Sequence, residues 1–535
     1  MTVEELLACR LRDHGVRRFF GIPGGPSIPY LEAFRKAGIE FILTSHEASA
    51  AVMADVTARI TGVTGVCHAT FGPGATNLST GVGGALLDRS PVLALTSELP
   101  DEWMGRTAQM NVDHQALFRP LTKATYRLNA GEAGEIISSS IEIANQEYPG
   151  PVHIGLPVGL AGTRASCTQA ERGNSVPATA GSPGEADIER TDERIKVLLA
   201  SSRRPLIAAG LTAMRHGIGA GLMQFLERHS VPVVVTPMAK GLLPSAHPCN
   251  AGVLFHALSH SLRRMTSEAD LIIGLGYDPV EYNYESWIPD VPLVHFDTRE
   301  TDLRIRGAIR SVSTPDRWFD ALSVLRSAPE MTALAAEARE EIVRGLRAAD
   351  RDFSPVTALN VLMDLLPADV VVTADVGSHL HVLGQMWDVP PSGRLIMTNG
   401  WSSMGFGLPA AMAAAFTNRD LPVVCVTGDG GFLMHAGEMI MARRYGLKII
   451  VVVLSDGELN LIRLKQSWKD LSPYGTRLCQ GSLFGSAMFL GCEVVLVNDA
   501  EQMHSAVRRA LQSDNSTIIE TVVDPSVYSD LVVRT

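Results

Sequence analysis

Short apolar segments alternate with helical patterns along most of this chain, and this alternation is the feature that most restricts its fold. Each apolar segment ends in a turn that contains Gly, Pro or Ser, and a helical pattern follows. Such alternation is typical of parallel sheets whose two faces are covered by helices. It occurs in three separate sets, so we predict an α/β protein with three doubly wound parallel-sheet domains. The expected strands are Arg18–Ile22, Phe41–Thr44, Gly65–Thr70, Val92–Thr96, Leu206–Ala209, Val231–Val235, Leu271–Gly274, Val370–Thr373, Val423–Thr427 and Ile449–Leu454.

Two stretches separate these three sets. Residues Thr163–Glu189 are rich in Ser, Gly, Thr, Pro and Ala, a composition that is typical of an interdomain linker. Residues Glu330–Asp352 form an Ala/Glu/Arg helical pattern that ends before Phe353-Ser-Pro355. The total length is about three times that of one typical domain. We therefore predict domains at residues 1–165, 185–330 and 353–535.

Composition and charge argue against several classes of partner. Lys and Arg number 46 and Asp and Glu number 57, and the net charge of −11 argues against nucleic acid or an anionic membrane as the main partner. The seven cysteines form no C-x-x-C pair, so neither a zinc site nor a disulfide framework is expected. The longest aliphatic run, Ile449–Leu454, is too short to span a membrane, and Met1–Leu7 lacks the pattern of a signal peptide. We expect a cytoplasmic protein with reduced thiols.

A glycine-rich segment follows one of the expected strands. It reads Val426-Thr-Gly-Asp-Gly-Gly-Phe432, and a helical pattern starts near His435. Glycines at a strand end let backbone N–H groups approach an anion closely, and the start of a helix adds positive potential. The carboxylate of Asp429 suits a hard cation such as Mg²⁺ that bridges to phosphates. Taken alone, the segment is equally well explained as a plain tight turn.

A second polar segment, Ser455-Asp-Gly-Glu-Leu-Asn460, follows the next expected strand. The 24 residues between Gly430 and Ser455 suffice for one helix and one strand. Asp429 and Asp456 are therefore expected at the carboxyl ends of neighbouring parallel strands, where open α/β sheets bind ligands. Two carboxylates and a loop carbonyl could form most of an octahedral Mg²⁺ site.

The Gly-Asp-Gly segment and the polar pair after it resemble the diphosphate-binding motif of thiamine diphosphate enzymes. The resemblance implies that Asp429, Asp456 and the backbone oxygen of Glu458 are ligands of Mg²⁺. In that family the polar pair is usually Asn-Asn, whereas this chain has Ser455-Asp456. The aspartate keeps the oxygen ligand and adds a negative charge beside the diphosphate.

A second element that resembles this family is Thr44-Ser-His-Glu-Ala-Ser-Ala50. In the family the Glu of the His-Glu pair hydrogen-bonds the pyrimidine ring of the cofactor, which implies that role for Glu47. Its carboxyl favours the imino tautomer of the exocyclic amine, whose nitrogen takes a proton from the thiazolium carbon. A glutamate with a raised pKa in an apolar pocket suits this task. On its own, Glu47 would instead be read as a helix-start residue that complements the helix dipole.

Further segments resemble the family in the same order along the chain. Phe20–Gly25 resembles its first strand and turn. Met404, in Asn399–Pro409, resembles the large apolar residue that forces the cofactor to bend, although a lone Met is more often core filler. The segment Phe71–Asn77 resembles the loop that lines the pyrimidine pocket, and Asp375–His379 resembles a loop on the diphosphate side. The resemblance assigns to cofactor binding Pro73 and Asn77 in the first loop, Gly377, Ser378 and His379 in the second, and Gly430, Gly431 and Leu459.

Within the family, the pattern resembles the acetolactate synthase group most. Asp113-His-Gln115 precedes Pro120–Lys123, much as a Phe-Gln pair does in acetolactate synthases, and a His-Gln pair here also resembles carboxyethylarginine synthase. Gln115 is predicted to donate to the oxyanion of substrate or intermediate. His114 is either a residue that moves protons or a surface histidine.

The middle domain shows little sign of cofactor chemistry. Gly276–Tyr282 and Trp287 resemble the catabolic, flavin-free acetolactate synthases. Leu206–Thr212 follows a strand but has no GxGxxG pattern, so a dinucleotide site is not supported. We therefore expect thiamine diphosphate and Mg²⁺, and no FAD.

The resemblance implies an enzyme that decarboxylates a 2-oxo acid, pyruvate first of all, and joins the product to a second 2-oxo acid. The alternatives are a simple decarboxylase, a carboligase with another acceptor such as an amine, and a non-catalytic binding subunit. Because the family's cofactor lies between two chains, we expect a homodimer or homotetramer with active sites between subunits. The other expected partners are small-molecule 2-oxo acids.

Overall fold

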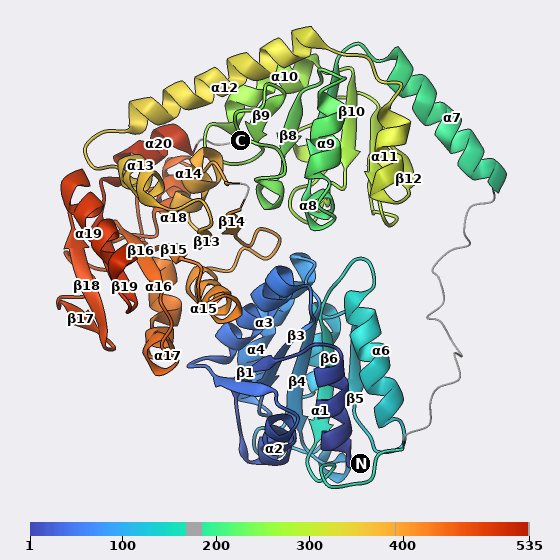
Figure 1. Cartoon of the computed structure of the whole chain (residues 1–535), viewed down its shortest axis with the longest axis vertical. Coiled ribbons are helices and arrows are strands. Elements are labelled where there is room, and N and C mark those ends of the chain that lie inside the picture. The colour runs from blue at the N-terminus through green and yellow to red at the C-terminus, as the bar shows by residue number, and fades with distance from the viewer. Residues whose placement is uncertain (167–184, 391, 533–535) are drawn as a thin grey trace.

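The computed structural model describes residues 1–166, 185–390 and 392–532. They form three α/β domains, each built on one sheet, and every strand pair is parallel except β17 with β18. The predicted fold class, three doubly wound parallel sheets, is confirmed. Figure 1 shows the N-terminal domain at the bottom, the middle domain at the top and the C-terminal domain at the left.

The N-terminal sheet has six strands in the order β2-β1-β3-β4-β6-β5. Its central strands β3 (Gly65–Ala69) and β4 (Val92–Glu98) are buried along their whole length, because helices cover both faces. The other strands are β1 (Arg18–Ile22), β2 (Glu40–Leu43), β5 (Ala124–Arg127) and β6 (Val152–Pro157). The helices are α1 (Val3–Asp13), η1 (Gly25–Ser27), α2 (Ile28–Lys36), α3 (Glu47–Thr61), α4 (Pro73–Leu87), η2 (Asp101–Trp103), α5 (His114–Phe118), η3 (Arg119–Leu121) and α6 (Ala133–Asn145).

The middle sheet also has six strands, in the order β12-β11-β10-β7-β8-β9. These are β7 (Pro205–Ala209), β8 (Val233–Val235), β9 (Asn250–Val253), β10 (Leu271–Leu275), β11 (Leu293–Asp297) and β12 (Ile309–Val312). Its helices are α7 (Glu185–Ser201), α8 (Leu211–Arg215), α9 (Gly219–Leu226), η4 (Pro237–Ala239), η5 (Ser259–Leu262), α10 (Arg263–Glu268), η6 (Tyr284–Ser286) and α11 (Pro315–Leu322). The long helix α12 (Pro329–Ala349) then leads to the C-terminal domain (Figure 1).

The C-terminal sheet has seven strands in the order β14-β13-β15-β16-β19-β18-β17. They are β13 (Val371–Ala374), β14 (Arg394–Ile396), β15 (Val423–Gly428), β16 (Ile450–Ser455), β17 (Met488–Phe489), β18 (Cys492–Val497) and β19 (Thr517–Val522). Its helices are α13 (Pro355–Leu365), α14 (Ser378–Met386), α15 (Gly407–Thr417), α16 (Asp429–His435), η7 (Ala436–Glu438), α17 (Met439–Arg444), α18 (Asn460–Ser467), α19 (Ala500–Gln512), η8 (Pro525–Val527) and α20 (Tyr528–Leu531).

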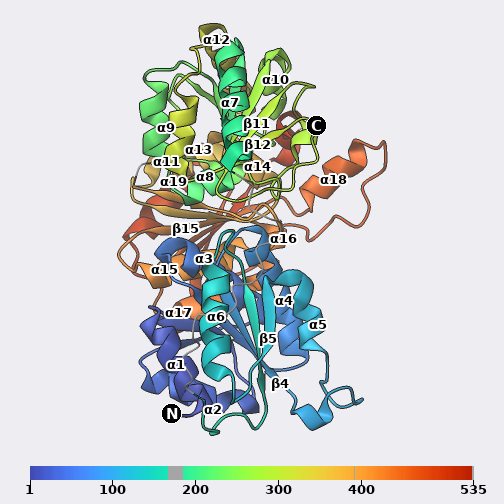
Figure 2. The same cartoon turned by 90° about the vertical axis from the view of Figure 1, so that its right-hand side faces the viewer.

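Helix α15 joins the C-terminal domain to the N-terminal domain. Every residue from Gly407 to Phe416 is buried, as expected for a helix that is apolar all round. Ala50 and Ala54 of α3 belong to the same apolar core as Ala411 and Ala414 of α15, and these small side chains let the two helices approach closely. Figures 1 and 2 show α3 beside α15 at the boundary between the two domains.

Two features bear on the class of protein. No helix in the described part of the chain is long and apolar enough to cross a membrane. The six described cysteines are free, as predicted, and Cys167 lies outside the described residues.

All ten predicted strands are present, with ends that differ by one or two residues. The expected helix at Glu330–Asp352 is also present as α12. Helix α7 begins at Glu185, the residue at which the middle domain was expected to begin, and residues 167–184 of the expected linker lie outside the described part. One boundary was wrong. Helix α16 begins at Asp429 rather than near His435, and the Asp429 carboxylate accepts one hydrogen bond from the neighbouring Gly430 amide and one from the Gly457 amide after β16.

Candidate active site

Both halves of the predicted site lie where the strand order of a sheet reverses. In the C-terminal sheet, β14 and β15 lie on opposite sides of β13, so a crevice opens between the ends of β13 and β15. Asp375–His379 follows β13, and Asp429–Gly431 follows β15. In the N-terminal sheet the corresponding point is between β1 and β3, and Phe71–Asn77 follows β3. Open α/β sheets bind ligands at these points.

Asp429 is the first residue of α16 and stands at the end of β15. Gly428 before it has extended backbone and caps the helix. The Asp429 carboxylate accepts a hydrogen bond from the Gly430 amide through Oδ1 and from the Gly457 amide through Oδ2, both at 2.8 Å. The residue is only 3% exposed, and burial raises the pKa of its carboxyl. The bonds hold the carboxylate between the ends of β15 and β16.

Asp456 follows β16, which pairs in parallel with β15, so the two aspartates lie at adjacent strand ends as predicted. Its Oδ1 accepts from the Glu458 amide at 3.0 Å. Burial, and then the negative charge of Asp429, raise the pKa of Asp456 to about 7. A backbone bridge between Glu458 and Arg477 holds the segment that carries the predicted carbonyl ligand. A buried carboxylate and a half-buried one that repel each other fit a bound divalent cation.

Several buried polar atoms at this edge have no hydrogen-bond partner among the described residues. They are Oγ of Ser378, Nε2 of His379 and both amide atoms of Asn460. Ser378 and His379 open α14, where free backbone N–H groups and the helix dipole favour an anion. Unpaired buried polar atoms cost free energy unless a ligand satisfies them. This edge of the sheet therefore fits the diphosphate of a cofactor.

Met404 and Leu459 meet over Gly430. A Cβ atom at Gly430 would lie 2.9 Å from Cδ2 of Leu459 and 3.1 Å from Cε of Met404, so only glycine leaves these side chains in place. Asp375 holds the turn that carries Met404, because its two oxygens accept backbone amides of that turn at 2.9 and 3.0 Å. Burial raises the pKa of Asp375 to about 6.

Glu47 is the first residue of α3, as the helix-start reading predicts, but it is only 7% exposed. Its Oε2 accepts a hydrogen bond from Nδ2 of Asn77 at 3.0 Å. A Cβ atom at Gly74 would lie 3.3 Å from Oε1, so the first turn of α4 closes against the carboxyl. The structure thus brings together Glu47 and Asn77, two residues that were assigned to the cofactor from separate motifs.

The segment Phe71–Asn77 was expected to be a loop, and this expectation was wrong. Pro73 begins α4, and Asn77 lies within this helix. Proline is favoured at the first helical position, because its missing N–H would have no partner there. The helical turn places the Asn77 side chain one turn further along the helix, facing Glu47.

The C-terminal domain fixes the start of α3 from the other side. Glu438 is fully buried, and its carboxylate accepts the backbone amides of Ser45 and His46, each at 3.0 Å. Oγ of Ser49 lies 2.8 Å from Nδ1 of His435. These contacts join the end of α16 to the start of α3 within one chain.

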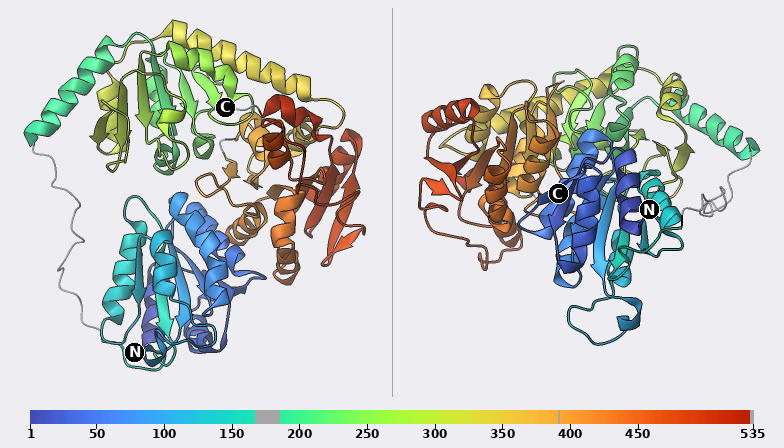
Figure 3. Two further views of the ribbon diagram at one scale, coloured as in Figure 1. Left: turned by 180° about the vertical axis from the view of Figure 1, so that it is seen from behind. Right: turned by 60° about the horizontal axis from the view of Figure 1, so that its bottom comes forward.

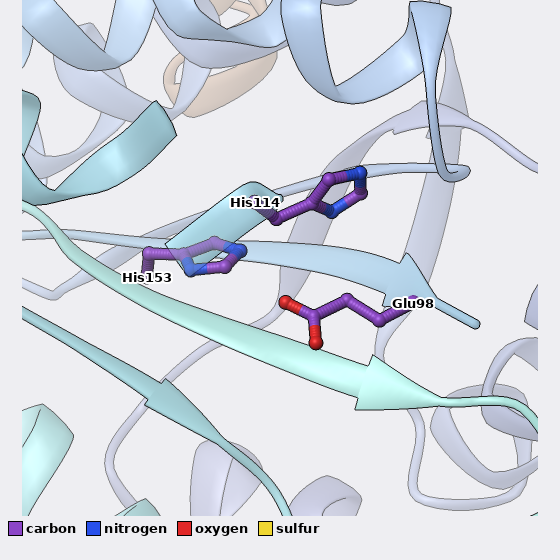
Figure 4. A group of neighbouring side chains, drawn as sticks. All are labelled: Glu98, His114 and His153. Carbon is purple, nitrogen blue, oxygen red and sulfur yellow. The ribbon is translucent and has the colours of Figure 1, made fainter. Parts of the chain in front are cut away.

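His114 is buried beside Glu98 and His153, so its reading as a surface histidine was wrong. Figure 4 shows the three side chains, from α5, β4 and β6, pointing toward one another. Nε2 of His114 accepts from the Gly72 amide at 3.3 Å, and its Nδ1 lies 2.9 Å from Oγ1 of Thr96. Burial lowers the pKa of His114 to about 4.

Gln115 uses its whole amide within the protein. Its Nε2 donates to Oε1 of Glu98 at 2.6 Å and to the Tyr126 carbonyl at 3.2 Å. Its Oε1 accepts from Oγ1 of Thr125 at 2.7 Å. The oxyanion role stays a prediction, and it requires Gln115 to release one of these bonds.

Sequence reasoning assigned no role to Asp375 or Glu438. A signal existed for Asp375, which follows an apolar strand in the same way as Asp429. No local signal existed for Glu438, whose partner Ser45 is 393 residues away in the sequence.

The aromatic residues singled out in the middle domain form a packed cluster. Tyr277 stacks on Tyr284 with ring centroids 4.1 Å apart, and Nε1 of Trp287 donates to the hydroxyl of Tyr277 at 3.0 Å. Beside it, a cavity of about 300 Å³ is lined by Pro279, Asn283, Tyr284, Glu285, Asp302, Leu303 and Arg304. The cluster explains why these aromatic residues are buried.

A second, small cavity lies where the N- and C-terminal domains meet. Ala48 and Val52 of α3 line it from one side, and Met404 and Trp401 from the other. Its volume of about 20 Å³ admits a single water molecule, far less than a diphosphate cofactor. This cavity of the single chain therefore does not enclose the cofactor.

The site therefore has two halves at the strand ends of separate α/β domains. One half is built around the buried Glu47 and the other around Asp429 and Asp456, an arrangement that suits an enzyme with a diphosphate cofactor. Sequence families match all three domains. The N-terminal TPP binding domain of thiamine pyrophosphate enzymes matches residues 1–117, the central domain residues 193–317, and the C-terminal TPP binding domain residues 375–521.

Individual relatives agree with these matches. An acetolactate synthase from Arthrospira platensis is 32% identical over 85% of this chain and 82% of its own length. A probable acetolactate synthase large subunit from Methanococcus aeolicus is 27% identical over 99% of this chain and 94% of its own, and the isozyme 2 large subunit of Escherichia coli is 29% identical over 96% and 94%. The chain belongs to the thiamine pyrophosphate (thiamine diphosphate) enzyme family.

Proposed function

We propose that this chain is an Mg²⁺-dependent, acetolactate synthase-like enzyme that decarboxylates pyruvate and joins the two-carbon product to a second 2-oxo acid. The observation that carries the proposal is the pair of carboxylates, the buried Asp429 and the half-buried Asp456, at adjacent strand ends beside unpaired polar atoms. The names of the relatives support the choice of reaction.

Each half-site has its own task in this proposal. Bound thiamine diphosphate supplies an acidic thiazolium carbon that adds to a 2-oxo acid and accepts the electrons left when CO₂ departs. Asp429, Asp456 and the backbone oxygen of Glu458 would hold Mg²⁺ beside the diphosphate. Glu47, fixed by Asn77, would hold a proton at the pyrimidine ring. Met404 would give the cofactor an apolar support.

Other predicted site residues complete these tasks. Ser378 and His379 would donate to diphosphate oxygens from the first turn of α14. Gln115 would bind the oxyanion by giving up its longer bond, the one to the Tyr126 carbonyl. The burial of His114 and the bond from Gly72 support a role in holding the pyrimidine side rather than in moving protons.

The test is product analysis. Purified protein is incubated with isotopically labelled pyruvate, thiamine diphosphate and Mg²⁺, and products are identified by mass spectrometry. We expect acetolactate, and none from the Glu47→Gln variant. Acetaldehyde alone would show a simple decarboxylase, and product formed only with an added amine would show a different carboligase. No turnover and no cofactor binding would show a non-catalytic subunit.

The active site is proposed to lie between two chains of a homodimer or homotetramer. Exposed apolar side chains occur near both half-sites. They are Trp103, Met104, Met110 and Val112, in the segment before His114 that projects from the N-terminal domain (Figure 3, right), and Leu433 and Met434 on α16. A second chain that covers them would complete the cofactor site, which the 20 Å³ cavity cannot do.

Mixing two inactive variants tests this arrangement. Glu47→Gln and Asp429→Asn chains are denatured together in equal amounts and refolded. If sites lie between chains, each mixed dimer has one site without either substitution, and about a quarter of wild-type activity returns. If each chain holds its own complete site, no activity returns.

The expected absence of flavin stays a prediction. At the reversal point of the middle sheet, a Cβ atom at Gly210 would lie 2.6 Å from Cα of Tyr277, so the two backbones meet closely there, which supports the expectation. The absorbance spectrum of the purified protein tests this. The free cysteines support the proposed cytoplasmic location.

A further inference from the structure

A chain of hydrogen bonds runs through the N-terminal domain, from the Phe71–Asn77 segment beside Glu47 to Arg127. Its first members are the Gly72 amide, His114, Thr96 and His153, joined at 3.3, 2.9 and 2.8 Å. Nδ1 of His153 then lies 2.7 Å from Oγ1 of Thr125, which bonds to Gln115 at 2.7 Å. Gln115 donates to Glu98, and Arg127 pairs with the other oxygen of Glu98.

The side chains that form this hydrogen-bond chain come from three adjacent strands and one short helix. Thr96 and Glu98 lie on β4, His153 on β6, Thr125 on β5, and His114 and Gln115 on α5. Thr96 and His153 are fully buried, and the His153 ring stacks on Phe118 at 4.3 Å. A Cβ atom at Gly155 would lie 2.1 Å from Oε1 of Glu98, so glycine is required there to admit the carboxylate. Water therefore has little access to these bonds.

The same residues could be taken for a metal site, because atoms of Glu98, His114 and His153 lie within 4.8 Å of one another. The hydroxyl of Thr96 occupies the space between the two ring nitrogens, at 2.9 and 2.8 Å. Both oxygens of Glu98 are already bonded, to Gln115 and to Arg127. The geometry therefore favours a hydrogen-bond chain over metal coordination (Figure 4).

The hydrogen bonds can run in only one donor-to-acceptor direction, because backbone groups fix the direction at both ends of the hydrogen-bond chain. The Gly72 amide can only donate, so Nε2 of His114 must accept and Nδ1 must carry the proton. Nδ1 donates to Thr96, whose single proton must then go to Nε2 of His153. At the other end, the Tyr126 carbonyl can only accept, so it faces the NH₂ of Gln115, and the amide oxygen faces Thr125.

These two constraints meet at His153. Its Nε2 accepts from Thr96, so its Nδ1 donates to Thr125, and Thr125 donates to Gln115. Every donor then has one acceptor, and reversing any bond would leave a buried polar group unpaired, which is unfavourable. Burial lowers the pKa of both histidines, which keeps them neutral as this arrangement requires.

We propose that Thr96, Thr125 and His153 are positioning residues, which impose the one tautomer of His114 that accepts the Gly72 amide and so hold the first turn of α4 against Glu47. The effect on cofactor binding rests on the proposed function. The effect on the Gly72 segment does not, because it concerns the protein without ligands.

Hydrogen exchange of the ligand-free protein, followed by mass spectrometry, tests the proposal. Thr96→Val removes the hydroxyl and keeps the shape, so exchange in peptides that contain Gly72 should rise about tenfold. Thr96→Ser should restore wild-type exchange. Thr122→Val is the matched control, because this buried hydroxyl bonds only to the Phe118 carbonyl. Unchanged exchange in Thr96→Val, or an equal rise in the control, would overturn the proposal.

A second variant and a second measurement keep the test decisive. If Thr96→Val does not fold, Thr125→Val is used instead. Hydrogen exchange at Gly72 equal to that of the wild type would then refute the proposed hydrogen-bond chain. The dissociation constant of thiamine diphosphate should rise in Thr96→Val, with an unchanged KM for pyruvate. If wild-type protein binds no thiamine diphosphate, the proposed function fails, and the exchange result still decides the hydrogen-bond chain.

Discussion

The two halves of the site differ in whether their buried polar groups have hydrogen-bond partners within the protein. Around Glu47 and His114, the polar side chains satisfy one another, from the Gly72 amide to the Glu98 carboxylate. Around Asp429, by contrast, Ser378, His379 and Asn460 have buried atoms without partners among the described residues. The hydrogen bonds from the Gly72 amide to the Glu98 carboxylate are complete in the free protein, although Oγ1 of Thr44 and Oγ of Ser97 nearby lack partners among the described residues, whereas three side chains around Asp429 lack partners.

This difference separates two tasks. A proton-transfer group must be held at one place and in one protonation state before the cofactor arrives, so satisfied bonds around it are useful. A diphosphate and a cation bring their own charges, so their site must leave donors and carboxylates unpaired. We therefore expect substitutions in the N-terminal half to affect chemistry or stability more than binding, and substitutions in the C-terminal half to affect mainly binding.

The largest expected effect is on proton exchange. Glu47→Gln keeps a hydrogen-bonding group beside Asn77 but cannot share a proton with the pyrimidine ring. Exchange of the thiazolium C2 proton in bound cofactor, measured by NMR after acid quench, should fall by about 10²–10⁴-fold, while cofactor affinity changes little. Exchange at the wild-type rate would remove Glu47 from this role.

Asp429→Ala should have the opposite signature. Loss of a ligand and of the bond to the Gly457 amide should weaken Mg²⁺-dependent cofactor binding by more than about 100-fold in titration calorimetry. Asp499→Ala is the matched control, since Asp499 caps α19 in the same domain. Binding as tight as in wild type would disprove the metal assignment.

Asp456 tests the departure from the family's asparagine. Unit charges ~4 Å apart interact by about 4 kcal/mol at an effective dielectric near 20, so an anionic ligand should bind Mg²⁺ more tightly. Asp456→Asn should stay active, need several-fold more Mg²⁺ for half-saturation and tolerate acid better, while Asp456→Ala should weaken cofactor binding severely. If both variants behave like wild type, Asp456 is not a ligand.

Removing one buried hydroxyl from each half sharpens the comparison further. Thr96→Val leaves two histidine nitrogens unpaired and should lower the free energy of unfolding by about 1–3 kcal/mol. Ser378→Ala removes a hydroxyl without a partner and should change it by less than about 0.5 kcal/mol. Urea denaturation of the ligand-free proteins measures both. Equal losses would show that the C-terminal half is satisfied as well.

Sequence patterns identified the strands and the carboxylates that follow them. The runs Val423–Thr427 and Ile449–Leu454 are long and apolar, so the positions of Asp429 and Asp456 at adjacent strand ends followed from spacing alone. The start of α16 was missed because Gly-Asp-Gly-Gly has low helix propensity, and tertiary hydrogen bonds outweigh that propensity.

Contacts between distant segments were beyond sequence reasoning. Glu438 meets Ser45 across 393 residues, and no pattern in the sequence links the two residues. A lone histidine such as His114 carries no periodic signal. Its burial follows from the pairing of strands β4 and β6, which the sequence around His114 does not show. The satisfied half was therefore the harder one to predict, because its partners are spread over several elements.

The smallest expected effect is a pH dependence of stability from His114. Its pKa falls from an ordinary 6.5 to about 4 on folding, because burial penalises the charged ring. The unfolded chain therefore takes up the proton first, so this stability is fully present above pH 6.5 and is lost as the pH falls toward 4. Between pH 7.5 and pH 6 the loss should be about 1 kcal/mol, measured from urea midpoints. His114→Gln should be less stable at pH 7.5 and lose less on going to pH 6. An equal loss in both proteins would mean that folding does not shift the pKa of His114, and the satisfied half would then not hold this ring neutral.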